Sequence, residues 1–490
     1  MLSPEKIMSC IAGDKYSRLK KQARIGQKYY NGRHDILDYR VFYVDKNGLL
    51  QEDFTKSNIR VPHPFFKEIA EQEVAYILSG GILFKSGYPE LEEYLKTYFG
   101  NAFLGEIQET LVDTIVNGFG YLYWYRDEKN ITRFTYAEAM GIAEVKDGEN
   151  TDTVNDYIIR YYPVTVKNGK KVVRVEVWDE KQTFYYIQSG NSLELDKNIP
   201  VNPCPHILYR VGSEYYYEET GRLPFKRLDN NRYRHSDVKQ IKPIIDDYDL
   251  MDCGLSNNLQ DIAEGIYVVK GFKGQSTDEL MWNVKSRRVV GVSEKGDLDI
   301  RTINIPYEAR KAKMDIDEKN IYRTALAFNA AQTGDGNITN IVLKSRYTLL
   351  DMKSQKLITR LKKFLMTPLE IAIEEINERF GTAYETEDVD IIIKPVVPTN
   401  DKENAEIRKM EAETKQIKVN TILDAATAVD EESIIKELCE VMDWDSEEVL
   451  KRKRFADELA AVREALNEEI PEGSETVPAG SGGGYQEETG

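Results

Sequence analysis

One apolar stripe, beginning at residue 236, constrains the fold of this 490-residue chain more than any other feature. Its apolar side chains recur every three or four positions, which is the spacing of one face of an α-helix. The stripe consists of Val238, Ile241, Ile245, Tyr248, Leu255, Leu259, Ile262 and Ile266. It predicts a helix over residues 236–266, about 45 Å long at 1.5 Å per residue. Ser236 is suited to cap its N-terminus, and Pro243 is expected to kink or delay it.

Several aspartates accompany the stripe, and we interpret most of them as a solvated acidic helix face. Asp252 occupies a position on the stripe itself. The opposite face carries Asp246, Asp247, Asp249 and Asp261. A catalytic or metal-binding site is disfavoured, because adjacent residues on a helix point about 100° apart and do not converge. We therefore predict no catalytic residue, metal ion or cofactor.

Two further long helices are expected, one from Tyr307 to about Asn329 and one from about Asn340 to Phe380. The last should end at Gly381 and bend at Pro368. Residues 267–305 read as short strands and turns between the first two helices. Long helices with one narrow apolar stripe are rarely satisfied within a monomer. We expect them to pack side by side with neighbouring copies, an arrangement that closes into a ring when the rotation allows.

A glycine-containing loop separates the last two helices. Its residues are Gln332, Thr333, Gly334, Asp335, Gly336, Asn337, Ile338, Thr339 and Asn340. A nucleotide-binding P-loop is disfavoured, because that motif needs four residues between its glycines and then Gly-Lys-Ser/Thr. Lys344 and Arg346 follow in the next helix. The sequence is equally compatible with phosphate contacts by these two residues and with ion pairing or simple solvation. For the later basic residues of that helix, ion pairing or solvation is favoured.

The composition of the chain argues against several classes of function. The chain has 83 acidic and 66 basic residues, a net charge of −17, which argues against a generic DNA-coating protein. A protein that touches DNA without holding it remains compatible. The four cysteines lie far apart, as expected for reduced thiols in a cytosolic setting. The four histidines lack metal-ligand spacing, the N-terminus lacks a signal-peptide pattern, and no run of about 18 apolar residues predicts a membrane span.

The remaining segments predict an α+β fold. Residues 1–35 and 89–117 have helical spacing, and residues 57–80 read as an extended entry followed by a helix. Residues 121–213 alternate as in antiparallel strands, with a hairpin signal at Asn168-Gly169. The tyrosine-rich strands could form a base-stacking platform, but the preference of tyrosine for half-buried strands is the favoured explanation. A short strand follows residue 388, then charged helices, and residues 471–490 have a disordered composition.

The order of these segments resembles the portal (head-tail connector) proteins of tailed double-stranded DNA bacteriophages, in the group with long non-contractile tails. Four stretches carry most of the resemblance: "KSNIRVPHPFFKEIAEQEVAYILSGG", "PIIDDYDLMDCGLSNNLQDIAEGIYVVKG", "TGDGNITN" and "IIIKPVVPTNDKENAE". At the junction of loop and helix, relatives often have Ser-Gly followed by small residues. This chain instead has Asn337-Ile338-Thr339-Asn340, so the resemblance does not fix where that helix begins.

The resemblance implies a phage portal fold with a mixed α/β wing over 1–235 and stem helices over 236–266 and 306–330. A β clip at 267–305, a tunnel loop at 331–340, a long wing and tunnel helix at 341–380 and a helical crown at 385–470 would follow, with a disordered tail at 471–490. It implies a non-enzymatic ring at one capsid vertex, with the twelve subunits that are usual in this family. The ring would serve as a channel for packaging and ejecting double-stranded DNA without sequence specificity.

The implied partners are the terminase large subunit, a head-completion or adaptor protein at the clip, and the major capsid and scaffolding proteins. The implied location is the virion, with assembly in the host cytoplasm. Two alternatives stay open: a capsid adaptor or scaffold protein without a channel, and, less favoured, a metal-dependent nucleic-acid enzyme that uses the aspartates.

Overall fold

A computed structural model describes residues 2–45, 47–54, 56–146, 155–165, 169, 171–190, 192–211, 214–218, 221–261, 266–272, 276, 278, 282, 292–301, 306–329, 340–396, 401–424, 431–442 and 446–455. The chain divides into two compact units. The first comprises Met1–Asn337 with Ile341–Pro398, and the second Ile338–Asn340 with Thr399–Gly490. Both helices and antiparallel sheets are present, which confirms the α+β prediction. Among the described residues, no helix has the length and apolar character needed to cross a membrane.

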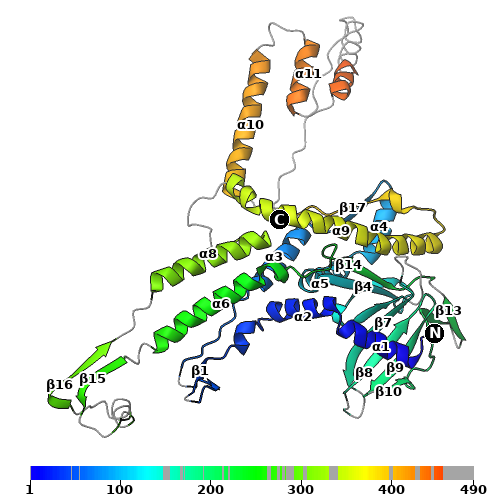
Figure 1. Cartoon of the computed structure of the whole chain (residues 1–490). Coiled ribbons are helices and arrows are strands. Elements are labelled where there is room, and N and C mark those ends of the chain that lie inside the picture. The colour runs from blue at the N-terminus through cyan, green and yellow to red at the C-terminus, as the bar shows by residue number, and fades with distance from the viewer. Residues whose placement is uncertain are drawn as a thin grey trace, which may run out of the picture. The chain divides into compact units, whose positions relative to one another are not determined.

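Helices dominate the N-terminal part of the first unit (Figure 1). The helical pattern over 1–35 resolves into two helices, because Ser17 caps a second start by accepting a hydrogen bond from the backbone N–H of Lys20. Helix α3 ends before Gly81, whose φ of +71° suits glycine. The helices are α1 (Pro4–Lys15), α2 (Arg18–Tyr30), η1 (Asp35–Asp38), α3 (Phe65–Leu78), α4 (Pro89–Tyr98) and α5 (Asn101–Asn117).

Antiparallel strands fill the region from Phe119 to Asp229, as the alternating pattern predicted. One sheet has the order β14-β4-β5, and another has the order β10-β9-β8-β7-β6 with β11 paired to β9. The hairpin signal is confirmed, since Thr165 pairs with Lys171 and Gly169 has a φ of +77°. The strands are β4 (Phe119–Arg126), β5 (Thr132–Ala137), β6 (Ile142–Val145), β7 (Tyr157–Thr165), β8 (Lys171–Trp178), β9 (Gln182–Ser189), β10 (Ser192–Leu195), β11 (Cys204–Pro205), β12 (Ile207–Val211), β13 (Glu214–Glu218) and β14 (Phe225–Asp229). A 3-10 turn, η2 (Ala139–Gly141), precedes β6.

Two tyrosines of these strands are hydrogen-bonded to carboxylates instead of being free to stack on bases. The hydroxyl of Tyr161 donates to Asp14 at 2.7 Å, and that of Tyr162 donates to Glu176 at 2.6 Å. Both contacts fit the interpretation that tyrosine is used here for half-buried packing.

Helix α6 (Val238–Asp261) and helix α8 (Tyr307–Ala325) pack against each other, with the antiparallel strands β15 (Ile266–Phe272) and β16 (Val292–Arg301) between them in sequence. Helix α6 continues through Pro243 without a delayed start. It is shorter than predicted, because Ile266 opens β15 instead of extending the stripe. The run Ile-Tyr-Val-Val favours a strand. Ile262 lies outside the described residues.

Helix α9 (Asn340–Phe380) has the predicted bounds. Gly381 ends it with a φ of +68°, a conformation that costs glycine little. Its apolar side lies in the main core of the same chain with α3, α5 and the start of α6, although packing with neighbouring copies was expected. The buried members on this side are Leu350, Leu357, Leu361, Phe364 and Leu365. Strand β17 (Val389–Ile392) then pairs with β3 (Leu83–Ser86), so it belongs to the first unit.

The second unit contains α10 (Asp401–Asp424), α11 (Glu431–Met442) and a helical stretch over 446–455. These helices agree with the charged helical pattern. The expected tunnel loop, except Asn340, and the tail at 471–490 lie outside the described residues.

Candidate functional site at the stem helices

An extended segment, residues 57–63, lies along α6, and we call it the strap. Among the described strands it pairs with none, yet alternate backbone N–H groups of the strap donate to α6 side chains that lie four residues apart. The four contacts are Ser57 to Asp261 (3.1 Å), Ile59 to Asn257 (2.6 Å), Val61 to the Cys253 sulfur (3.2 Å) and His63 to Asp249 (3.0 Å). Because residues four apart share one face of a helix, the strap fixes that face of α6 along its length.

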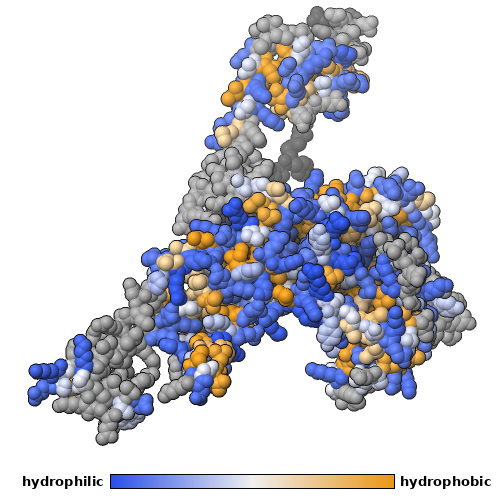
Figure 2. Space-filling view, in the orientation of Figure 1, coloured by the Kyte–Doolittle hydropathy of each residue, from blue (hydrophilic) through white to orange (hydrophobic). Residues whose placement is uncertain are grey.

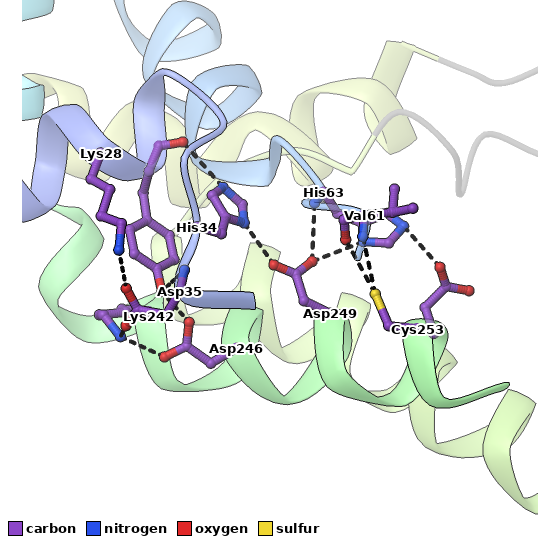
Figure 3. Close-up of polar contacts among 11 residues, drawn as sticks. Lys28, His34, Asp35, Val61, His63, Lys242, Asp246, Asp249 and Cys253 are labelled. Atoms are coloured by element: carbon purple, nitrogen blue, oxygen red, sulfur yellow. Dashed lines mark hydrogen bonds and ion pairs between the residues drawn. The ribbon is translucent and has the colours of Figure 1, made fainter. Parts of the chain in front are cut away.

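Asp249 is the centre of this arrangement (Figure 3). Its side chain is fully buried, with one oxygen 2.7 Å from His34 Nδ1 and the other 2.8 Å from His63 Nδ1. Burial alone would raise the pKa of the Asp249 carboxyl, but the hydrogen bonds from both histidines outweigh it and hold the pKa below its ordinary value. The same bond to Asp249 raises the pKa of His63. His34 also approaches the Tyr29 carbonyl at 3.2 Å, so the cluster joins α2 to α6.

The predicted solvated acidic face is therefore wrong for Asp249. Ile241, Ile245, Asp249 and Cys253 are all buried and follow one another in steps of four, so Asp249 lies beside the stripe and not opposite it. That spacing was the signal that could have identified it, whereas nothing local marked His34 or His63.

The other aspartates of this helix also have partners. Asp246 accepts from the Tyr29 hydroxyl and from Lys242, and Asp261 accepts from the strap. The carboxylate of Asp252 lies 3.4 Å from His63 Nε2. Within the described ranges, no group of three or more His, Cys, Asp or Glu side chains is arranged to hold a metal ion.

Helix α8 lies against a different face of α6. The Lys313 ammonium is 2.5 Å from the Asp247 carboxylate, and it also pairs with Asp317 on its own helix. Gly254 allows a close approach, since a Cβ there would lie 3.3 Å from the Arg310 guanidinium. At about 100° per residue, Asp247 and Gly254 point about 160° and about 140° away from Asp249. Helix α6 therefore has the strap on one flank and α8 on another.

The predicted packing stripe divides into an inner and an outer part. Val238, Ile241 and Ile245 are buried in the main core of this chain, with Tyr248 packed against it. Leu255 is also buried, but Leu259 is 59% exposed near the end of the helix. Much of the stripe is thus used within one subunit, and apolar surface remains towards the C-terminus of α6.

The basic residues of α9 have mixed positions. Lys344 and Arg346 lie in its first two turns, and their side chains are outside the described part of the chain. Lys353 is ion-paired within the chain, because its ammonium is 2.6 Å from Glu73 and 2.5 Å from Asp237. Ion pairing was the favoured explanation for this residue, and both acidic partners belong to the same chain.

Comparison with known proteins places the chain in a family. Residues 12–453 match the family described as "Phage portal protein, SPP1 Gp6-like". The portal protein of Bacillus phage SPP1 is 28% identical over 335 residues, which cover 67% of this chain and 65% of that relative. The portal protein of Clostridium phage phiCD119 is 24% identical over 460 residues, which cover 86% of this chain and 98% of that relative. The match spans most of the chain, so this protein belongs to the SPP1 Gp6-like family of phage portal proteins.

Proposed function

We propose that this protein is the subunit of a closed ring at one capsid vertex, through which double-stranded DNA enters and leaves the phage head. The observation that carries the proposal is the family match over residues 12–453. The stem supports it. Helices α6 and α8 form a packed pair, and the polar contacts of Asp249 and of Asp237 hold α6 to the rest of the first unit.

The parts of a portal can be assigned along the chain. Residues 1–235 would form the wing, α6 and α8 the stem, and β15 with β16 the clip. Residues 331–340 would form the tunnel loop, followed by the long helix α9. The crown predicted for 385–470 would consist mainly of α10, α11 and the stretch over 446–455, since β17 pairs with β3.

DNA in transit should be guided rather than bound. A net charge of −17 disfavours tight phosphate binding, and a glycine-containing loop offers few groups for reading bases. Lys344 and Arg346 are the candidate phosphate contacts, because they follow the loop directly in sequence. The protein itself would hydrolyse nothing, and the energy for translocation would come from the terminase large subunit.

The remaining partners follow from this role. A head-completion or adaptor protein would dock at the clip, and the major capsid and scaffolding proteins would surround the ring. The ring would assemble in the host cytoplasm and remain in the virion at the portal vertex.

The first experiment is the native mass of the purified full chain, with electron micrographs of the same sample. Twelve copies of a 56.3 kDa chain would weigh about 680 kDa. We expect closed rings with a central hole. A protein that stays monomeric even when co-expressed with scaffolding and capsid proteins would contradict the proposal and favour a capsid adaptor without a channel.

A further inference from the structure

A small hairpin before the strap exposes large apolar side chains. Strand β1 (Phe42–Val44) pairs only with β2 (Leu50–Glu52) among the described strands, and Val44 lies opposite Leu50. Phe42, Val44 and Leu50 share one face of the hairpin and are 51%, 65% and 66% exposed. Figure 2 shows hydrophobic residues gathered where Figure 1 places β1.

We expect the exposed apolar face of this hairpin to be buried against another surface. An isolated two-stranded hairpin is marginally stable in water, and a contiguous exposed apolar patch marks an interaction site more often than a free surface. This hairpin also leads into the strap, which α6 holds from Ser57 to His63. Its position is therefore set by the stem, and whatever covers it lies beside the stem.

Each subunit has the two halves of a head-to-tail contact. The strap and the hairpin lie on one flank of α6, and α8 lies on another, since Asp247 and Gly254 face α8 while Asp249 and Asn257 face the strap (Figure 1). Different surfaces on different flanks are what a heterologous contact uses, and such contacts generate rings.

The outer face of α8 is suited to receive the hairpin. Ala309, Ala312 and Ile316 are exposed at spacings of three and four, and Ile316 is 53% exposed. The exposed cations Lys319 and Arg323 lie beside the C-terminal part of this row, and the exposed carboxylates Glu308 and Asp315 lie beside its N-terminal part. The hairpin segment carries Asp45, Glu52 and Asp53, of which Glu52 is paired with Arg40 of the same chain at 3.4 Å. The match between the two surfaces is therefore one of exposed apolar area on the hairpin with exposed apolar area on α8.

We infer that the apolar face of β1–β2 packs against the exposed face of α8 on a second copy of this chain. The inference rests on the proposed ring and adds which surfaces join adjacent subunits. DNA is a poor alternative occupant, because an apolar face bordered by carboxylates does not attract phosphates.

A disulfide test identifies the contact directly. In the full chain, Val44→Cys combined with Ile316→Cys should give, after mild oxidation, a ladder of covalent multimers that collapses on reduction. Tyr43→Cys with Ile316→Cys is the matched control, because neighbouring residues of a strand point to opposite faces. The two single variants and the wild type, with its four native cysteines, should give no ladder. Native rings without a ladder in the Val44 pair would overturn the inference alone, and a wild type that never assembles would overturn both it and the proposed ring.

A charge test measures the contribution to assembly. Val44→Asp with Leu50→Asp should reduce the ring fraction at least tenfold by native mass, with an unchanged circular dichroism spectrum. Gln51→Asp adds a carboxylate on the opposite face and should assemble like the wild type. Rings at wild-type yield in the double variant would overturn the inference, and loss of incorporation into capsids from those rings would assign the face to a capsid protein instead.

Discussion

At the scale of single residues, Asp249 is the acceptor on which three segments converge. His34 follows α2, His63 ends the strap, and Asp249 itself belongs to α6. A fully buried carboxylate is costly unless it is paired and hydrogen-bonded. Here both oxygens have partners, and the backbone N–H of His63 adds a further bond. This cluster therefore attaches the stem to the N-terminal helices. Removing Asp249, His34 or His63 would leave buried polar groups of the others without a hydrogen-bond partner.

Asp249→Asn should destabilise the first unit by about 3 kcal/mol, because it removes the charge that both histidines face. Asp247→Asn is the matched control on the same helix. Its carboxylate is 42% exposed and should cost less than about 1 kcal/mol. Urea unfolding of both variants against the wild type measures the difference. Equal effects of the two substitutions would contradict the anchoring role of Asp249.

The same cluster predicts how stability depends on pH. The pKa of His63 is raised in the folded protein, so its contribution is full below the unfolded value of about 6.5 and is lost as pH rises through the folded pKa. The pKa of Asp249 is lowered, so its contribution is present above about 3.9 and is lost as pH falls through the folded pKa. The cluster should stabilise most between about pH 4 and pH 6.5.

His63→Gln tests the alkaline side of this window. The wild-type melting temperature should fall between about pH 6 and pH 8 by more than that of the variant, which has no imidazole to deprotonate. Thermal unfolding across this range measures both curves. Parallel curves for the two proteins would show that His63 does not contribute through its charge.

At the scale of elements, the sequence pattern predicted helix ends correctly where neighbouring residues alone determine them. The bounds of α9 followed from a continuous apolar row and a terminal glycine. The end of α6 was not predicted correctly. Ile262 and Ile266 continue a helical spacing, while the residues after 266 favour a strand. The His34–Asp249 contact spans 215 positions and the His63–Asp249 contact spans 186. No periodicity can indicate such pairs, since tertiary packing alone brings them together.

Lys353 joins three elements and gives a prediction at this scale. It lies on α9 and pairs with Glu73 of α3 and with Asp237 just before α6. Burial would lower the pKa of Lys353, but the two carboxylates outweigh it and raise the pKa. Lys353→Met would leave Glu73 buried without its partner and should cost about 3 kcal/mol.

Lys356→Met is the matched control for this prediction, because Lys356 is an exposed residue of the same helix. It should change the free energy of unfolding by less than about 0.5 kcal/mol. Chemical denaturation distinguishes the two variants. A tolerated Lys353→Met substitution would mean that hydrophobic packing alone holds α9 to α3 and α6.

At the scale of the whole molecule, sequence order carried the information that no single motif could. Each stretch that resembles portal proteins is weak alone, and the family match over 12–453 confirms their order. The surfaces between subunits were harder to predict. The stripe on α6 was expected to face neighbours, yet its first half is buried within the chain. Exposed apolar side chains near the stem lie instead on β1–β2, α8 and the end of α6. Only the tertiary structure shows which side chains stay exposed.

The tunnel loop gives the last prediction. Lengthening residues 333–339 or adding charge to them should leave the ring mass unchanged and block DNA packaging, because a bulky or strongly charged loop would obstruct or bind moving DNA. An equal insertion after Gly169 is the control, since that hairpin turn has open space around it. Native mass reports assembly, and nuclease-protected DNA in capsids reports packaging. Normal packaging by the loop variants would contradict the assignment of residues 331–340 to the channel. Loss of rings would instead indicate that the loop contributes to assembly.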